Sequence, residues 1–283
     1  PYSARERAEL PRMVSAMDGE DLAFVIHDGD IKSGGDPCSD EMLEDRLRLF
    51  ETSAHPLIYI PGDNEWTDCH RASNGGYDPL ERLSRLRQMF FAEPTLGGGK
   101  MPVIRQTPDY PENVRWQANG FQFVGLNVPG SNNNWGSRST PSEEYRKRSQ
   151  ANRLWLAKSF AEAREGALKG LILVIQANPG FEGDRDAAKR PDGYRELIDQ
   201  LRAETNRYPG SVVLIHGDTH YHRIDQPLTD PASGRLIDNF TRLETYGSPF
   251  MGWVKVTIDP EAEPPVRFES HPWLPLPSND THP

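Results

Sequence analysis

The sequence predicts an α/β fold, because short continuous apolar runs alternate with amphipathic helical patterns along most of its 283 residues. Four runs, at residues 22–27, 56–60, 171–176 and 211–216, have the unbroken apolar character of strands buried on both faces. Each run leads directly into a polar loop that contains glycine. The simplest geometry has the carboxyl ends of these strands converging, so that the four loops form one site.

Amphipathic helices are predicted between the strands, and two of them begin with a clear N-cap. Asp-Pro-Leu-Glu at 78–81 places an acid at the N-cap, proline at N1 and glutamate at N3, and Thr-Pro-Ser-Glu at 140–143 repeats the pattern. Pro11 weakens the first helical pattern, so we expect that helix to begin near it. The predicted helices span 3–17, 39–51, 78–90, 141–165 and 192–206.

Beyond residue 216 the periodicity changes from helical to alternating. Residues 240–246, 252–259 and 266–270 are predicted to form antiparallel strands, and Asn119-Gly120 predicts a hairpin turn. The segment 272–283 is rich in proline, and we expect it to be an extended tail. No change in composition marks a second domain, so the prediction is a single domain over residues 1–271.

Composition and charge restrict the class of function. The net charge is −10 and the sequence pI about 5.3, which argues against binding to the phosphate backbone of nucleic acids as the main activity. The mean hydropathy is −0.70, and no apolar run of about 18 residues is present, so no membrane span is predicted.

Two cysteines follow two of the polar strand ends. Cys38 lies eight residues after Asp30, and Cys69 lies six residues after Asp63. Parallel neighbouring strands would bring these two loops together, which favours a Cys38–Cys69 disulfide over the alternative of two free thiols. A disulfide in turn indicates a periplasmic or secreted protein, with the cytoplasm as the alternative.

The order of the polar loops resembles that of the calcineurin-like metallophosphoesterases. That family has five blocks, and four of them have counterparts here: Gly29-Asp30, Gly62-Asp63-Asn64-Glu65, the stretch 176–180, and Gly217-Asp218-Thr219-His220. The resemblance covers roughly residues 1–260 and implies a four-layer α/β/β/α sandwich of the metallophosphoesterase type. The first block is absent, so we expect the family's first strand and its Asp to lie immediately upstream of Pro1.

The resemblance also implies the site residues. The metal ligands would be Asp30, Asp63, Gln176, Asp218 and His220, and the residues with catalytic roles Asn64, His220 and Asp30. Several of them depart from the family pattern: Asp63 stands where the family has a ligand Asn, and Gln176 and Asp218 replace ligand histidines. Asn64 stands where the family has the His that contacts the scissile phosphate.

Two divalent ions are the implied cofactors, since a metal pair can bind a phosphoryl group and supply its water nucleophile. The substitutions remove imidazoles and add carboxylates, which favours Mn²⁺, Mg²⁺ or Ca²⁺ over zinc or iron. The function that the resemblance implies is therefore metal-dependent hydrolysis of phosphate mono- or diesters, with a small-molecule phosphate ester as the substrate. The alternative is a degenerate scaffold of the same fold that binds a ligand or partner without turnover.

Further residues have weaker predictions. His27 and His216 directly precede glycine turns, and we expect both to be buried histidines of the core or its polar support. Arg71 and Arg138 are the arginines we would test first for contact with phosphate. The loop 131–135, Ser-Asn-Asn-Asn-Trp, could form a substrate rim, with a solvated loop as the alternative.

Overall fold

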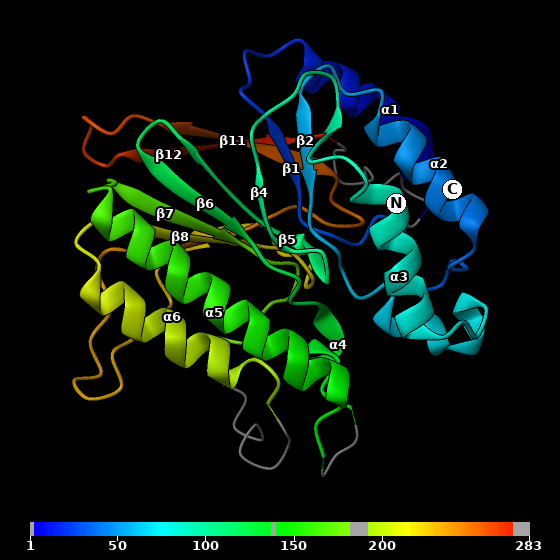
Figure 1. Ribbon diagram of the computed structural model, residues 1–283. Helices are drawn as coiled ribbons and strands as arrows, with labels where there is room; N and C mark the ends of the chain where they lie inside the picture. Colours follow the sequence, from blue (N-terminus) through cyan, green and yellow to red (C-terminus); the bar gives the residue numbers. More distant parts are fainter. Residues whose placement is uncertain (1–2, 137–139, 182–191, 274–283) are drawn as a thin grey trace, which may run out of the picture.

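The structure, a computed structural model, describes residues 3–136, 140–181 and 192–273. It is a mixed α/β protein whose strands form three sheets (Figure 1). A three-stranded sheet has the order β1-β2-β3, a seven-stranded sheet the order β4-β5-β6-β7-β8-β10-β9, and β11 pairs with β12. The predicted α/β class is confirmed.

The bounds of the elements follow the chain. The strands of the first sheet are β1 (Val25–His27), β2 (Pro56–Tyr59) and β3 (Leu96–Gly97). Those of the large sheet are β4 (Ile104–Thr107), β5 (Tyr110–Ala118), β6 (Phe121–Gly125), β7 (Gly170–Val174), β8 (Ser211–His216), β9 (Arg223–Asp225) and β10 (Phe240–Glu244). The third sheet has β11 (Gly252–Ile258) and β12 (Val266–Pro272). The helices are α1 (Ala4–Asp18), α2 (Asp40–Phe50), α3 (Pro79–Phe90), α4 (Gly130–Asn133), α5 (Glu143–Glu165) and α6 (Arg195–Arg207), with 3-10 turns η1 (Thr67–His70) and η2 (Ala72–Asn74).

Both faces of the large sheet are buried. Successive side chains of a strand point to opposite sides, so each strand contributes to two hydrophobic clusters. In β7, Leu171 and Leu173 pack in a cluster with Trp155, Phe160 and other residues of α5 and α6. The intervening residues of β7 point the other way, into a second cluster that includes side chains of β2, β11 and β12. Figure 1 shows α5 and α6 side by side over this sheet.

The small sheet packs against α2 and α3. Leu43 and Phe50 of α2 and Leu86 and Phe90 of α3 pack in a third cluster, together with Tyr59 of β2. Strands β1 and β2 are parallel, with His27 opposite Tyr59, and β6, β7 and β8 are mutually parallel in the large sheet. The carboxyl ends of β1, β2, β7 and β8 therefore deliver the polar loops that the sequence singled out.

One local prediction held in part and another was wrong. The strand β10 pairs antiparallel with β9, as expected, with Arg242 opposite Asp225, but on its other side it pairs in parallel with β8, with Phe240 opposite Val212. The helix α1 begins at Ala4 rather than near Pro11, because the Ser3 and Glu6 side chains form a reciprocal capping box at its start. The hydrogen bonds of that box favour helix ahead of the proline.

The disulfide Cys38–Cys69 is present, with Cα atoms 5.7 Å apart and the two residues 31 positions apart in sequence. Both residues are fully buried, and their sulfurs lie 3.4 and 3.6 Å from the carbonyl oxygen of Asn64. The bridge thus ties the loop that follows Asp30 to the segment that contains Asp63 and Asn64. The physical reason is the parallel pairing of β1 with β2, which places the two loops side by side.

Removing this bridge is expected to destabilise the protein. Replacing both cysteines, Cys38→Ala with Cys69→Ala, should lower the free energy of unfolding by about 3–4 kcal/mol, because a loop of about 30 residues gains entropy in the unfolded chain. Urea denaturation of the variant and of the parent measures the difference. Dithiothreitol should weaken the parent by a similar amount and leave the variant unaffected; a change below about 1 kcal/mol in both comparisons would contradict the expectation.

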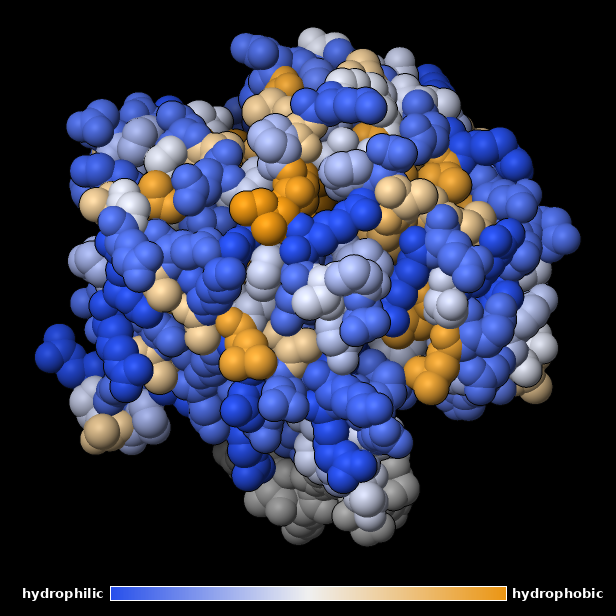
Figure 2. Space-filling view, viewed as in Figure 1, coloured by the Kyte–Doolittle hydropathy of each residue, from blue (hydrophilic) through white to orange (hydrophobic). Residues whose placement is uncertain are grey.

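The face seen in Figure 2 is predominantly hydrophilic, and its hydrophobic residues are scattered in small groups, in keeping with the mean hydropathy of −0.70. None of the helices in the described ranges has the length and apolar character needed to cross a bilayer.

Candidate metal centre

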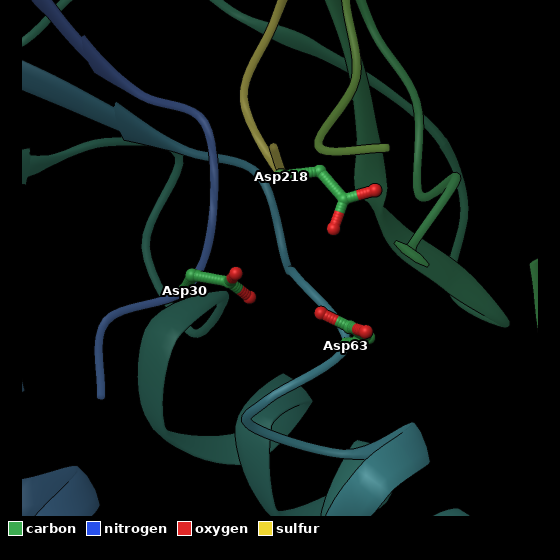
Figure 3. Close-up of side chains that lie close together, drawn as sticks. All are labelled: Asp30, Asp63 and Asp218. Atoms are coloured by element: carbon green, nitrogen blue, oxygen red, sulfur yellow. The ribbon is translucent and has the colours of Figure 1, made fainter. Parts of the chain in front are cut away.

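Three aspartates from three strand ends meet at one point. Asp30 follows β1, Asp63 follows β2 and Asp218 follows β8, and one carboxylate oxygen of each lies within 4.8 Å of the others. Their side chains point toward one another (Figure 3). The sequence argument expected these three acids to converge, and the structure brings them together.

Backbone geometry in the tight loops aims two of these carboxylates. Asp30 has φ 57° and Asp218 has φ 78°, both in the left-handed region that aspartate tolerates better than most residues. The Asp30 amide donates to Glu65 Oε1 at 2.9 Å, and the same oxygen accepts from the Gly62 amide and the Tyr59 hydroxyl, each at 2.7 Å. Glu65 thus fixes the loops after β1 and β2 relative to each other.

Gln176, which follows β7, lies between two of the acids as a hydrogen-bond donor. Its Oε1 accepts from the Gly130 amide at 2.5 Å, and this contact fixes the orientation of its side-chain amide. Its Nε2 consequently faces the carboxylates, 3.3 Å from Asp63 Oδ1 and 3.4 Å from Asp218 Oδ1. The predicted role as a metal ligand needs the amide oxygen, so in this arrangement Gln176 positions the acids instead.

The short element α4 and the residue after it form a left-handed turn rather than an α-helix, and this turn lies beside the acids. Ser131, Asn132, Asn133 and Asn134 all have φ between 50° and 55°, which is unusual for consecutive residues other than glycine. The Ser131 hydroxyl lies 2.9 Å from Asp63 Oδ2 and 2.7 Å from Asp68 Oδ1. Asparagine is among the residues that adopt this conformation most readily, which explains the Asn run.

Groups outside the turn hold it in place. The fully buried Arg148 of α5 donates to the Asn133 carbonyl at 2.9 Å and to Asn133 Oδ1 at 2.6 Å. The Tyr194 hydroxyl accepts from the Asn133 amide and donates to the Pro129 carbonyl, both at 3.1 Å. These bonds offset the cost of the left-handed backbone and keep Gly130 and Ser131 against the acids.

Several carboxyl groups of the site have raised pKa values, because they are buried and lie close to one another. Burial raises the pKa of Asp30 well above its usual value, and the charges of Asp63, Glu65 and Asp218 raise it further. Burial, followed by the charge of Asp63, raises the pKa of Asp218 to about 6. Burial also raises the pKa values of Glu65 and of Asp28, the latter to about 6.

These residues fit a hard divalent cation. The donors offered by Asp30, Asp63 and Asp218 are all oxygens, which suit Mg²⁺, Ca²⁺ or Mn²⁺. A second observation points the same way: Glu65 is fully buried, and its Oε2 has no hydrogen-bond partner among the described residues. Bound cations would offset the excess negative charge that otherwise raises the carboxyl pKa values.

Glycine is required where the backbone touches the acids. A methyl group at Gly130 would lie 2.7 Å from Asp63 Oδ2 and 2.8 Å from Asp218 Oδ1, closer than real Cβ contacts allow.

Gly130→Ala should therefore displace both carboxylates without changing any charge, and lower the affinity for Mn²⁺ by about 10-fold or more. Calorimetric titration with Mn²⁺ measures the loss. Gly35→Ala, where the nearest atom would be 3.7 Å away, is the matched control and should bind as the parent does; equal affinities of the two variants would contradict the close approach at Gly130.

Two predicted site residues lie differently from the acids. His220 is not in the group of three; it has φ 64°, and a Cβ at Gly247 would lie 2.5 Å from its Cδ2, so its ring packs against that glycine. Asn64 approaches the acids with its backbone, whose amide donates to Asp30 Oδ1 at 3.3 Å, while its side-chain oxygen lies beside Gly34.

The remaining sequence predictions near the site have mixed outcomes. His216 is fully buried, as expected, whereas His27 is only partly buried. Desolvation lowers the pKa values of both rings to about 4, so both are neutral near pH 7. Arg138 and residues 274–283 of the predicted tail lie outside the described ranges.

Sequence reasoning missed three residues that contact or surround the acids. Glu65 was noted only as part of a motif, Ser131 only as part of a loop, and Lys32 not at all. Lys32 is fully buried, and its ammonium donates to the carbonyls of Ser33 and Asp36 at 3.0 and 2.9 Å. The signal for Ser131 was the run Gly-Ser-Asn-Asn-Asn, whose residues favour a left-handed turn.

The fold of this chain has a counterpart among solved structures. A solved structure titled "Structure of PhoD" is similar to 91% of this chain, with a TM-score of 0.54 and 14% sequence identity. The chain spans 58% of the length of that PhoD chain, and at this identity the likeness shows the fold alone. No protein-family model matches the sequence. No curated protein matches it either.

Proposed function

We propose that this protein is a cation-dependent hydrolase of phosphate esters. The observation that carries the proposal is the meeting of Asp30, Asp63 and Asp218 at strand ends of a phosphoesterase-like fold. Three carboxylates in one small volume repel one another, and a bound cation would offset this repulsion.

The chemistry divides between the cations and the protein. A pair of divalent ions would supply a polarised water nucleophile and would offset the charge of the phosphoryl group. Asp30 lies close to both Asp63 and Asp218, and the charges of both raise its pKa. We therefore assign it the role of bridging two ions. Gln176 orients Asp63 and Asp218 through its amide nitrogen, and we retain His220 as a candidate for contact with substrate or metal.

We also propose the finer assignments made from the sequence. The chain is a divergent member of the calcineurin-like metallophosphoesterases and a single domain over residues 1–271. Its small sheet and the β11–β12 pair together form one inner layer of an α/β/β/α sandwich. Support comes from the shared core cluster in which Ile58 of β2 and Val256 of β11 pack with Ile172 of β7.

The buried Cys38–Cys69 bridge supports a periplasmic or secreted location. Disulfides of this kind persist in oxidising compartments and are rare where thioredoxin and glutathione keep thiols reduced.

A second candidate is a ligand-binding scaffold without turnover. Asn64 favours it, because the resemblance implies a phosphate-contacting His at that position, and an amide cannot take or give a proton as imidazole does. The retained acids favour the enzyme.

Hydrolysis assays on the purified protein separate the two candidates. p-Nitrophenyl phosphate and bis(p-nitrophenyl) phosphate would be incubated with Mn²⁺, Mg²⁺ or Ca²⁺, and with EDTA as the control. We expect release of nitrophenol that needs the cation and stops on chelation. A thermal unfolding scan in parallel reports binding alone, since a cation that binds the folded state raises the melting temperature. Stabilisation by the cation without hydrolysis of either ester supports the scaffold, and absence of both effects rejects the metal centre.

A further inference from the structure

An arginine and a serine lie at the edge of the acid cluster and are linked to it directly. The Ser131 hydroxyl is 2.9 Å from Asp63 Oδ2, and Arg71 Nη2 donates to the same hydroxyl at 3.4 Å. Arg71 Nη1 also pairs with Asp68 at 2.8 Å. The guanidinium is therefore one hydrogen bond removed from a carboxylate of the candidate metal centre.

The position of Arg71 is fixed while part of its guanidinium remains open to solvent. Its side chain is 48% exposed, whereas that of its partner Asp68 is only 4% exposed. Asp68 forms an ion pair with Nη1, and the Ser131 hydroxyl accepts a hydrogen bond from Nη2. An arginine has five N–H groups, so these two contacts leave others available to bind an oxyanion.

Two other cations that lie close to this region are already used. Lys32 is fully buried, and its ammonium is bound to two backbone carbonyls. Arg148 is fully buried and is bound to Glu144, Asn127 and Asn133. Of these three cations, Arg71 is therefore the one that a solute can reach.

We propose that Arg71, positioned by Asp68 and Ser131, binds the third terminal oxygen of a phosphomonoester. This inference rests on the proposed function and narrows its substrate class. A phosphomonoester has three terminal oxygens and a charge near −2, whereas a diester has two terminal oxygens and a charge of −1. Once two oxygens face the cation site, a monoester presents a third anionic oxygen to Arg71, and a diester presents its second alcohol group instead.

The reaction is written ROPO₃²⁻ + H₂O → ROH + HPO₄²⁻. The bond from phosphorus to the ester oxygen breaks, and a bond from phosphorus to the water oxygen forms. One water proton goes to the alcohol, and the other stays on the phosphate. Arg71 takes no proton in this scheme; it stabilises the charge on the phosphoryl oxygens.

The first test compares two esters in the presence of Mn²⁺. Arg71→Ala should lower kcat/KM for p-nitrophenyl phosphate by about 10- to 100-fold, the range expected for one charge-assisted hydrogen bond. For bis(p-nitrophenyl) phosphate the loss should stay below about 3-fold, since no terminal oxygen reaches Arg71. Arg71→Lys keeps the charge without the planar fork and should recover part of the monoester activity.

The control variant is Arg202→Ala on α6. Arg202 forms the same i,i+3 ion pair at the same distance, 2.8 Å to Asp199, and one further bond to a carbonyl oxygen. The variant Arg202→Ala should leave the ratio of kcat/KM for p-nitrophenyl phosphate to that for bis(p-nitrophenyl) phosphate unchanged. Circular dichroism of each variant checks that the fold is intact, and Arg71→Lys serves as the test variant if Arg71→Ala does not fold.

The second test is binding of inorganic phosphate, measured by calorimetry with Mn²⁺ present, and it does not depend on turnover. Arg71→Ala should weaken phosphate binding by about 10-fold or more, and Arg202→Ala should not. If the parent hydrolyses neither ester, the proposed function fails, while a phosphate affinity that depends on Arg71 still supports the anion subsite. If the parent is active but Arg71→Ala changes neither phosphate affinity nor the monoester-to-diester ratio, the inference is overturned and the function stands.

Discussion

Asp30→Asn is expected to lower the proposed phosphoesterase activity with Mn²⁺ by at least about 100-fold. Removing a group that merely supports a metal ligand costs about 10- to 100-fold, and the loss of a bridging ligand should exceed that range. The asparagine amide has nearly the same shape as the carboxylate, so the contact from the Asn64 amide at 3.3 Å can be kept. The loss would therefore report charge and metal ligation rather than packing.

Asp63→Asn is the matched control, because it makes the same chemical change 33 positions along the chain. Ser131 has one hydroxyl proton and lies beside two carboxylates, Asp63 Oδ2 at 2.9 Å and Asp68 Oδ1 at 2.7 Å. An amide in place of Asp63 would donate to the Ser131 oxygen, and the Ser131 proton would then go to Asp68. We expect this variant to keep activity within about 10-fold of the parent.

Steady-state kinetics on both variants and Mn²⁺ titrations decide the assignment. A loss at Asp63→Asn equal to that at Asp30→Asn would show that the two acids are equivalent ligands. Full activity of Asp30→Asn would remove Asp30 from the reaction and with it the bridging role.

The metal-free protein should lose stability as the pH rises from 5 to 8. Asp28 and Asp218 have folded-state pKa values of about 6, above the usual 3.8, chiefly because they are buried. A carboxyl whose pKa is raised by folding stabilises the folded state below its unfolded pKa, and that contribution is lost as the pH rises through the folded pKa. Each of the two groups should lose about 1.4 kcal/mol over this range, or about 3 kcal/mol together.

Urea denaturation in EDTA at pH 5, 6, 7 and 8 measures this trend, and the same series with Mn²⁺ is its counterpart. A bound cation offsets the carboxylate charge, so the fall in stability should shrink or reverse when Mn²⁺ is present. A metal-free protein that gains stability from pH 5 to 8 would show that the raised carboxyl pKa values do not govern its stability.

The sequence predicted the parts of the site that depend on strand order. Polar residues at the ends of buried strands gave Asp30, Asp63 and Asp218, because parallel strands deliver their carboxyl ends to a common edge. The same reasoning placed Cys38 beside Cys69. These inferences need only the direction of the strands, which apolar runs and loop lengths reveal.

What the sequence did not show depends on side-chain orientation and on tertiary hydrogen bonds. The motif position of Gln176 predicts a ligand, but the Gly130 amide, 46 residues away, turns its amide nitrogen to the acids. The parallel pairing of β10 with β8 was missed, although β10 also pairs antiparallel with β9, because alternation marks a strand without giving the direction of its neighbours. The role of Ser131 arises from contacts with Asp63 and Asp68, more than 60 residues distant.

The left-handed turn at 131–134 has a consequence for anyone who would graft this site onto another protein. Copying the loops with Asp30, Asp63 and Asp218 would not suffice, because Gly130 and Ser131 belong to a conformation that the chain does not adopt unaided. The host scaffold would also need a helix that presents an arginine as α5 presents Arg148, and a tyrosine hydroxyl placed as in Tyr194. The smallest portable unit is therefore the three loops together with the turn and its two anchors.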